Sequence, residues 1–296
     1  MKFGDVKNPD EIDFALPDDH PDTAQVLSKF GNGKPEVYVG CAKWTRQELK
    51  GLYPRGTKDE LEYYGSQFNA VELNATFYRN FSPKQITNWY EKVPSHFRFF
   101  PIVNRQISHR NRLENIENTK ENFLNSVMHF EEKLGVIFLQ MQEDFSPKHF
   151  DRVQKFVENW PEELSLAIEF RHPDWYNDPE VSGELYHLLE ENDVANIIVD
   201  TAGKRDIMHM RLTNNNAFIR YAGTNHPSDY QRLDDWVDRL KIWNDQGLQN
   251  IQFFVHQNEE KASPKLSAYF IKSLNNTIGT DLHFPNLADG GQGDLF

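Results

Sequence analysis

Short apolar segments alternate with longer amphipathic ones through most of this 296-residue chain. The apolar segments have the length and composition of buried strands, and they lie at 37–41, 70–74, 97–103, 136–140, 164–168, 195–200, 218–221 and 251–256. Segments with helical spacing of apolar residues lie at 58–68, 83–92, 119–133, 147–160, 179–192, 229–246 and 264–274. No hairpin turn joins two of the predicted strands, so the pattern predicts an α/β fold with a parallel sheet.

The number of predicted strands, eight, favours a single (β/α)8 barrel of the TIM type. The alternative is an open doubly wound sheet, which usually carries a glycine-rich phosphate turn after its first strand. The residues that follow the first strand here, Gly40 to Trp44, do not form that motif. We therefore expect an N-terminal arm at 1–35 with a short helix near 23–30, the barrel at 36–277, and a flexible C-terminal tail at 278–296.

Composition excludes several classes of protein. A formal charge of -13 and a pI near 5.3 argue against strong direct binding of nucleic acid, which requires cations that displace phosphate counterions. The single cysteine, Cys41, excludes an internal disulfide and a multi-cysteine metal site. No apolar stretch has membrane-spanning length, and the first residues lack the apolar core of a signal peptide. We expect a cytoplasmic protein without membrane association.

The segment 164–176 carries the clearest functional signal. Its apolar strand ends in Glu169 and Arg171, and Pro173 then prevents further strand pairing. Residues two apart on a strand face the same way, so the carboxylate and the guanidinium share one face. Barrel enzymes hold their catalytic groups at the carboxyl ends of the strands. The sequence therefore predicts an active site around Glu169.

Polar side chains also end other predicted strands. Glu72 and Glu169 lie three strands apart, a separation from which both could reach one substrate bond as general acid and base, and Asp200 is a third candidate catalytic residue. Arginines would hold an anionic group, and aromatic side chains would stack on a sugar or a base. The candidate substrate-binding residues are Trp44, Asn74, Tyr78, His109, Gln140, Arg171, His172, Trp175, Arg220, Tyr221 and His256.

Alternatives to this site remain open. A mutually satisfied ring of ion pairs, such as Glu169 with Arg171 or Arg220, would explain the charges without a ligand. The aromatic residues could form a hydrophobic collar around the strand ends. The histidines could include metal ligands beside Glu169 or Asp200, but no HxH or HExxH spacing supports this. A divalent metal is therefore not favoured, and no cofactor is assigned.

Seven ordered motifs resemble the YecE-like family, which is also called domain of unknown function 72. They are Gly40 to Trp44, Tyr53-Pro54, Val71 to Tyr78, Ile107 to His109, Leu139-Gln140, Glu169 to His172 with Trp175, and Arg220 to Gly223. The resemblance covers about 36–275 and implies a TIM-type barrel, but it supplies no mechanism.

The chain departs from the family pattern at two places. Many members carry a lysine at the end of the third strand, where this chain has Phe100 to Val103. Many also carry a histidine before the glycine of the seventh-strand motif, where this chain has Ala222. Any role of those two family residues is therefore not carried over to this chain.

The chain ends in Gln292-Gly-Asp-Leu-Phe296 after a glycine-rich stretch. This peptide resembles the motif by which bacterial replication and repair proteins bind the DNA polymerase sliding clamp, with Leu295 and Phe296 as apolar anchors, Gln292 as a polar clasp, and Asp294 between them. Such a tether would bring an acidic protein close to DNA. In the alternative, Leu295 and Phe296 pack back onto the barrel.

Three hypotheses for the function follow. The first is a hydrolase or lyase that acts on a nucleotide, a nucleic-acid lesion or a sugar phosphate and is recruited to the clamp by its tail. The second is an enzyme of small carbohydrates or sugar phosphates that is unrelated to DNA. The third is a non-catalytic adaptor that only binds at the strand ends. The expected partners are the sliding clamp and a small anionic or sugar-containing ligand.

Overall fold

The computed structural model describes residues 5–31 and 33–288. In this part of the chain the strands are β1 (Glu36–Cys41), β2 (Ala70–Leu73), β3 (Arg98–Pro101), β4 (Ile137–Gln140), β5 (Leu166–Glu169), β6 (Ala195–Asn196), β7 (Ile198–Asp200), β8 (Asn216–Gly223) and β9 (Asn250–Gln257). They form one sheet of order β3-β2-β1-β9-β8-β7 and a second of order β4-β5-β6. Every ladder between these strands is parallel, which confirms the predicted α/β class.

The two sheets do not form one closed ladder. Between β3 and β4 only isolated parallel bridges occur, at Phe99–Leu134 and Ile102–Phe138. The predicted sixth strand is divided at Ile197, because its first part pairs with β5 and its second part with β8. Ile197 itself donates its N–H to the carbonyl of Ile168 at 2.9 Å. The strands are thus parallel, as predicted, but the two sheets do not close into a complete eight-stranded barrel.

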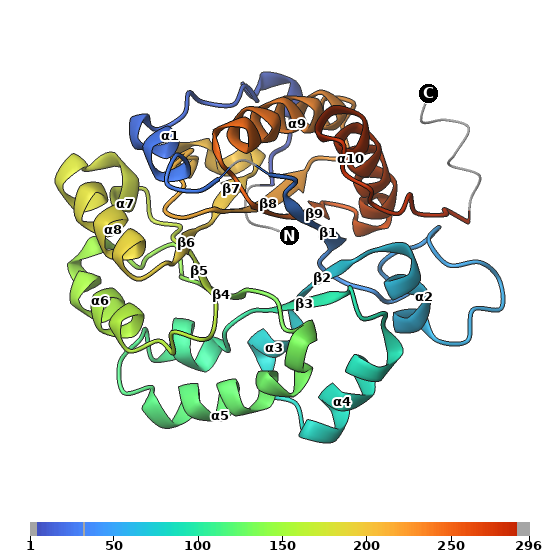
Figure 1. Ribbon diagram of the computed structural model, residues 1–296, viewed down its shortest axis with the longest axis horizontal. Helices are drawn as coiled ribbons and strands as arrows, with labels where there is room; N and C mark the ends of the chain where they lie inside the picture. Colours follow the sequence, from blue (N-terminus) through green and yellow to red (C-terminus); the bar gives the residue numbers. More distant parts are fainter. Residues whose placement is uncertain (1–4, 32, 289–296) are drawn as a thin grey trace.

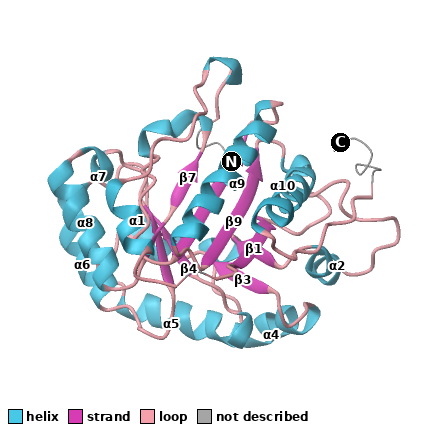
Figure 2. Cartoon of the chain, turned by 45° about the horizontal axis from the view of Figure 1, so that its top comes forward, coloured by secondary structure: helices cyan, strands magenta, loops and turns pink. Residues whose placement is uncertain are grey.

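Helices surround the strands (Figures 1 and 2). They are α2 (Glu60–Gln67), α4 (Pro83–Lys92), α5 (Glu117–Val127), α6 (Phe150–Glu158), α8 (Pro179–Glu191), α9 (Ser228–Gln246) and α10 (Ser263–Ile278), with the one-turn helices α3 (Ala75–Tyr78) and α7 (Asp174–Asn177) after β2 and β5. Capping residues in the sequence explain several starts. Ser82 accepts a hydrogen bond from the N–H of Gln85 at the start of α4, and Asp178 caps α8 in the same way. Both helices have proline in their first turn.

The connection between β7 and β8 contains a 3-10 segment, Ala202–Ile207, where the other connections carry longer helices. Helix α1 (Pro21–Leu27), from the N-terminal arm, packs at this place beside α9 (Figure 1). The Thr23 hydroxyl donates to the carbonyl of Met210 at 3.0 Å and accepts from the N–H of Leu212 at 3.2 Å. The arm therefore completes the outer layer of helices.

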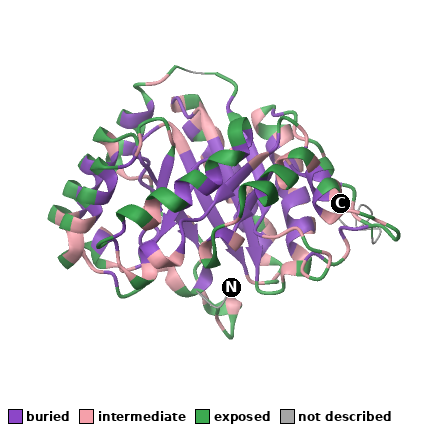
Figure 3. Cartoon of the chain, turned by 90° about the horizontal axis from the view of Figure 1, so that it is seen from below, coloured by how far each residue is buried: buried purple, intermediate pink, exposed green. Residues whose placement is uncertain are grey.

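The core has two parts. One lies on the inner face of the strands and contains Phe100, Phe138, Phe218 and Phe254. The other lies between the strands and the helices, so that the strands are buried on both faces while exposed residues lie on the outer surfaces of the helices (Figure 3). Within the described ranges, none of the helices is both long and apolar enough to cross a membrane.

Candidate functional site

Arg220 lies at the centre of a buried ionic network on the inner face of the strands. Its Nε and Nη2 atoms donate to the two carboxylate oxygens of Glu72 at 2.9 and 2.7 Å. Its Nη1 atom donates to Glu169 and, at 2.9 Å, to the amide oxygen of Gln140. One guanidinium from β8 thus joins side chains from β2, β4 and β5. The predicted convergence of Glu72 and Glu169 is present in the structure, with Arg220 between them.

Arg171 forms the solvent side of this network. Its Nε donates to Glu169 and its Nη2 donates to the Gln140 amide oxygen at 2.7 Å. The side chain of Arg171 is 10% exposed, whereas those of Glu72 and Glu169 are 0% exposed. We call Glu72, Gln140, Glu169, Arg171 and Arg220 the central network. As whole residues, Arg171 and Gln140 are the two most exposed members of the central network, each at 9%.

His256, at the end of β9, adds a positive charge beside the network. Its Nε2 lies 3.1 Å from Glu72, and its Nδ1 lies 3.8 Å from Glu260. Burial alone would lower the pKa of His256, but the negative charge of Glu72 and the hydrogen bonds to both carboxylates raise it to about 9. The imidazole is therefore protonated at neutral pH. Glu260 was not predicted, and its position four residues after His256 is the only sign of it in the sequence.

Both carboxylates of the central network are ionised. Burial alone would raise the pKa of Glu72 and of Glu169, but the neighbouring charges outweigh it. Arg220 and His256 lower the pKa of Glu72, and Arg171 and Arg220 lower that of Glu169. The structure thus shows the paired ring that the sequence left open as an alternative. The roles of Glu72 and Glu169 as acid and base stay a prediction.

His109 lies half-buried at the edge of the network. Its Nδ1 is 2.8 Å from the hydroxyl of Ser108, and its ring contacts Phe77 edge to face. Burial and then the positive charge of Arg171 lower the pKa of His109 to about 4. The ring is therefore neutral at pH 7.

Four other predicted binding residues also lie near the strand ends. Asn74 donates to Glu72 at 2.9 Å. Trp44 is half-buried and packs against Trp89, while Tyr78 is 63% exposed. The Nδ1 atom of His172 accepts the N–H of Asp174 at 3.2 Å. Of these four, Asn74 alone has a direct hydrogen bond to the central network among the described residues.

Asp200 and Tyr221 do not join the central network, contrary to the prediction. Asp200 pairs with Arg205 and accepts hydrogen bonds from Arg232 Nη2 at 2.7 Å and from Trp236 Nε1 at 2.8 Å. Tyr221 is 0% exposed and donates to the carbonyl of Asp229 at 3.1 Å. Adjacent strand residues face opposite sides, so Arg220 and its partner Val199 point inward while Tyr221 and Asp200 point outward. We call Asp200, Arg205, Tyr221, Asp229, Arg232 and Trp236 the outer cluster.

Trp175 is also in a different place from the one predicted. Its ring packs in an aromatic group with Phe145 and Phe170, and its Nε1 donates to the carbonyl of Phe145 at 2.6 Å. Because the side chain is 0% exposed, it cannot stack on a ligand in this arrangement.

Two further sequence predictions concern the tail and a metal. The tail residues Gln292, Asp294, Leu295 and Phe296 lie outside the described residues. Within 5–31 and 33–288, no three His, Cys, Asp or Glu side chains are grouped so that they could hold a metal ion.

Comparisons with known proteins agree with this fold. The model of the family described as "Protein of unknown function DUF72" matches residues 38–287. The chain is 24% identical to the UPF0759 protein YecE of Escherichia coli K12 over 261 residues, which covers 82% of this chain and 94% of that protein. It is 22% identical to the UPF0759 protein YunF of Bacillus subtilis over 209 residues, which covers 64% of this chain and 71% of that protein.

Solved structures give the same result. A DUF72 family protein from Enterococcus faecalis V583 superposes with a TM-score of 0.66 at 20% identity, covering 86% of this chain and 100% of that one. A DUF72 family protein from Thermotoga maritima MSB8 superposes with a TM-score of 0.64 at 23% identity, covering 81% and 99%. The parallel α/β fold, the family model and these relatives together show that the chain belongs to the DUF72 family.

Proposed function

We propose that this chain is a hydrolase or lyase that binds a small anionic substrate, a sugar phosphate or a nucleotide, at the carboxyl ends of its strands. The observation that carries the proposal is the position of Arg171, a partly exposed guanidinium held in place by Glu169 and Gln140 and close to the neutral His109. A fixed guanidinium binds a phosphate oxygen pair with favourable geometry. We also propose that the strands close a (β/α)8 barrel, because isolated bridges link β3 to β4 and β6 continues into β7.

The charges suggest how such a substrate would activate the site. An anion on Arg171 competes with Glu169 for the guanidinium and releases one oxygen of this carboxylate to act as a general base. The other oxygen stays on Arg220, which keeps Glu169 in position. The same anion offsets the positive charge of Arg171 and raises the pKa of His109 from about 4 toward its ordinary range. With its pKa raised, His109 takes up a proton from solvent and donates it to the leaving group, while Glu169 holds the proton that it removed.

Binding is tested by calorimetric titration with inorganic phosphate, ribose 5-phosphate and deoxyadenosine monophosphate. Wild type is compared with Arg171→Gln and with Arg55→Gln, which removes an exposed arginine elsewhere on the surface. We expect Arg171→Gln to weaken the binding of the best of the three ligands about tenfold or more, while Arg55→Gln binds like wild type. Equal affinity in Arg171→Gln, or no binding of any of the three in wild type, would exclude this site.

Catalysis is tested with Glu169→Gln. This variant keeps the volume of the side chain but loses the basic carboxylate, so we expect ligand binding to remain and turnover of the bound ligand to disappear. Product formation is followed by phosphorus and proton NMR. Unchanged turnover of the bound ligand in Glu169→Gln would refute the assigned role.

A non-catalytic adaptor is the second candidate, and one observation favours it: both carboxylates of the central network are already paired. The two candidate functions predict different outcomes of the same gene replacement in cells. Replacing the chromosomal gene with Glu72→Gln or Glu169→Gln leaves an adaptor's function intact and removes that of an enzyme.

The C-terminal peptide Gln292 to Phe296 supports a further proposal, recruitment by the DNA sliding clamp. We expect purified full-length protein to bind a purified bacterial clamp, and Leu295→Ala with Phe296→Ala to weaken this binding about tenfold or more, because apolar anchors dominate such interfaces. Ile242→Ala, which truncates an exposed apolar side chain on α9, is the matched control. Clamp binding by the double variant equal to that of wild type would exclude recruitment through this peptide. The hypothesis of an enzyme unrelated to DNA would then remain.

A further inference from the structure

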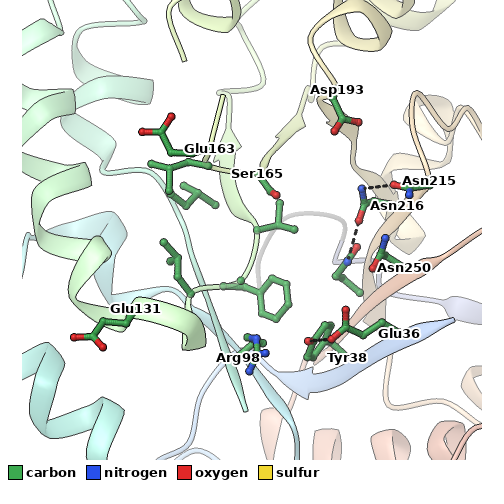
Figure 4. A pocket seen from close by; sticks show the side chains of 17 residues that line it. Glu36, Tyr38, Arg98, Glu131, Glu163, Ser165, Asp193, Asn215, Asn216 and Asn250 are labelled. Carbon is green, nitrogen blue, oxygen red and sulfur yellow. Dashed lines mark hydrogen bonds between the residues drawn. The ribbon is translucent and has the colours of Figure 1, made fainter. Parts of the chain in front are cut away.

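The two ends of the strands differ in charge. A cavity of about 480 Å³ opens at the amino ends, and its charged wall residues are four carboxylates and one guanidinium, Glu36, Glu131, Glu163, Asp193 and Arg98 (Figure 4). At the carboxyl ends, the segments 74–82 and 102–112, which directly follow β2 and β3, contain four arginines and no aspartate or glutamate. In a chain with a formal charge of -13, this local positive charge gives an anionic partner one side to approach.

Three of these four arginines, Arg79, Arg105 and Arg110, form no ion pair with any carboxylate of the described residues. Arg79 and Arg110 are exposed, and Arg105 is half-buried. The fourth, Arg112, pairs with Asp144 at 2.9 Å. Guanidinium groups without a carboxylate partner keep their donors for a phosphate.

An exposed aromatic ring lies beside these arginines. Tyr78, in α3, is 63% exposed, and the guanidinium carbon of Arg105 lies 5.4 Å from the centroid of its ring. The Asn104 side chain donates to Asn80 Oδ1 at 3.4 Å, which joins the segment after β3 to the segment after β2. We call Tyr78, Arg79, Arg105 and Arg110 the basic rim. An exposed ring beside guanidinium groups is the combination that binds the bases and phosphates of a single-stranded nucleic acid.

Ring contacts connect the basic rim to the central network. The rings of Tyr78 and Phe77 meet edge to face with centroids 5.2 Å apart, and those of Phe77 and His109 do so at 4.8 Å. Burial and next the positive charge of Arg171 lower the pKa of His109, so this histidine lies close to Arg171. A ligand on the rim therefore lies beside the candidate site.

The chemistry of the rim favours a short single strand over other polyanions. A duplex offers only the edges of its bases in the grooves, so its bases cannot stack on Tyr78, and the acidic remainder of the chain repels its long phosphate backbone. An acidic peptide would pair with the arginines but would leave the ring of Tyr78 without a planar partner.

We propose that the basic rim binds a short single-stranded oligonucleotide, with one base stacked on Tyr78 and phosphates on Arg105 and Arg110, and directs a phosphorylated end of the strand toward Arg171. This direction rests on the proposed function, in which Arg171 binds the phosphate, whereas the contacts at the rim do not depend on it. The substrate of the site is then the end of a nucleic-acid strand.

The test of the rim is calorimetric titration of the full-length protein with hexathymidylate and hexauridylate at several salt concentrations. We expect at least one of the two to bind, and Tyr78→Leu to weaken the binding of the better one about fivefold or more, because the stacking surface is lost. Tyr78→Phe keeps the ring and is expected to bind like wild type. Arg105→Gln should weaken binding and lower the slope of log affinity against log salt by about 0.7, the contribution of one phosphate contact.

Three controls keep the result specific. Arg55→Gln removes an exposed arginine elsewhere on the surface and is expected to bind the hexamers like wild type. Poly-L-glutamate and a short DNA duplex are the polyanion comparators. The proposal is overturned if neither hexamer binds, if Tyr78→Leu binds like wild type, or if either comparator binds as tightly as the better hexamer.

A terminal phosphate separates this proposal from the proposed function. We expect a hexamer phosphorylated at its 5′ or 3′ end to bind more tightly than the unphosphorylated one, and Arg171→Gln to remove this advantage while the loss in Tyr78→Leu persists. If Tyr78→Leu weakens binding but neither terminal phosphate adds affinity, the rim is upheld and the anion site at Arg171 is overturned. If inorganic phosphate binds at Arg171 and neither hexamer binds, the proposed function stands and the rim is overturned.

Discussion

The central network and the outer cluster are two buried ionic groups on opposite faces of β8, and they differ in what covers them. In the central network, Arg220 joins Glu72 and Glu169 and connects through Gln140 to the partly exposed Arg171. In the outer cluster, Arg232 binds Asp200 and lies between the rings of Phe14 and Tyr221, with centroids 4.3 and 4.4 Å away.

The residues that cover each group explain why the central network is a candidate site and the outer cluster is not. The N-terminal arm covers the outer cluster, because Arg205 donates to the carbonyls of Phe14 and Ala15 as well as pairing with Asp200. The central network has its partly exposed cation at the carboxyl ends of the strands. Burial of charge is therefore insufficient to mark a functional site. Each group holds one partly exposed arginine, Arg171 at 10% and Arg205 at 21%, and the property that separates the groups is the contact of Arg205 with the N-terminal arm.

The largest expected effect of a substitution is in the central network. Arg220→Met leaves Glu72 and Glu169 buried without the cation that joins them, and we expect the free energy of unfolding to fall by about 3–5 kcal/mol. Glu72 keeps its contact with His256 and Glu169 keeps that with Arg171, so part of the loss should be recovered below about pH 5, where carboxylates that have lost Arg220 become protonated. Urea denaturation at two pH values measures both effects. A loss below about 1 kcal/mol would show that Arg220 is not the organising cation.

In the outer cluster the equivalent change should cost less. After Arg232→Met, Asp200 keeps its pairing with Arg205 and its hydrogen bond from Trp236. Asp229, the other partner of Arg232, keeps the hydrogen bonds from the N–H groups of Thr224 and His226. We therefore expect a loss of about 2 kcal/mol, measured by the same denaturation. If Arg232→Met is as destabilising as Arg220→Met, the contrast between the two groups is wrong.

Alkaline pH should distinguish the two groups. The folded pKa of His256 is raised from 6.5 to about 9, so its contribution to stability is complete below the lower value and is lost as the pH rises through the higher one. We expect a decrease on the order of 3 kcal/mol between about pH 6 and about pH 10. His256→Gln should flatten this part of the profile. Arg232→Met should leave this part of the profile unchanged. The lowered pKa of Asp200 and the raised pKa of Arg232 place the titration of both groups outside the range from about pH 6 to about pH 10.

The smallest expected effect concerns the cover of the outer cluster. Phe14→Ala removes a ring that lies 4.3 Å from the guanidinium carbon of Arg232 and 5.9 Å from that of Arg205. We expect a loss of about 1 kcal/mol in the free energy of unfolding. Phosphate affinity at Arg171 should not change, and a change there would show that the arm also acts on the central network.

Much of the fold follows from local patterns in the sequence. Apolar runs and capping residues predicted β2, β4, β9, α4 and α8 to within about two residues of their ends. The sequence predicted a short helix in the arm but not its position beside α9, because the contact of Thr23 with Met210 joins residues 187 positions apart. The division of the sixth strand also depends on distant partners, since β6 pairs with β5 and β7 with β8.

The predicted positions of the site residues agree with the structure where side-chain alternation along the strands was applied, and they differ from it where it was not. Alternation places Glu72, Glu169 and Arg220 inside the strands, as found. The same rule places Tyr221 outside once Arg220 is inside, so this error could have been avoided from the sequence. The pairing of each carboxylate with a particular guanidinium depends on how strands from distant parts of the chain line up.

The position of α1 has a consequence for biosynthesis. This helix leaves the ribosome before its hydrogen-bond partners Met210 and Leu212, which follow Thr23 by 187 and 189 residues. Strand β1 likewise waits for β9, with which it pairs from Glu36 to Cys41. The apolar segments of α1 and β1 therefore lack their native partners until these later residues have been translated, and we expect such non-local contacts to slow folding.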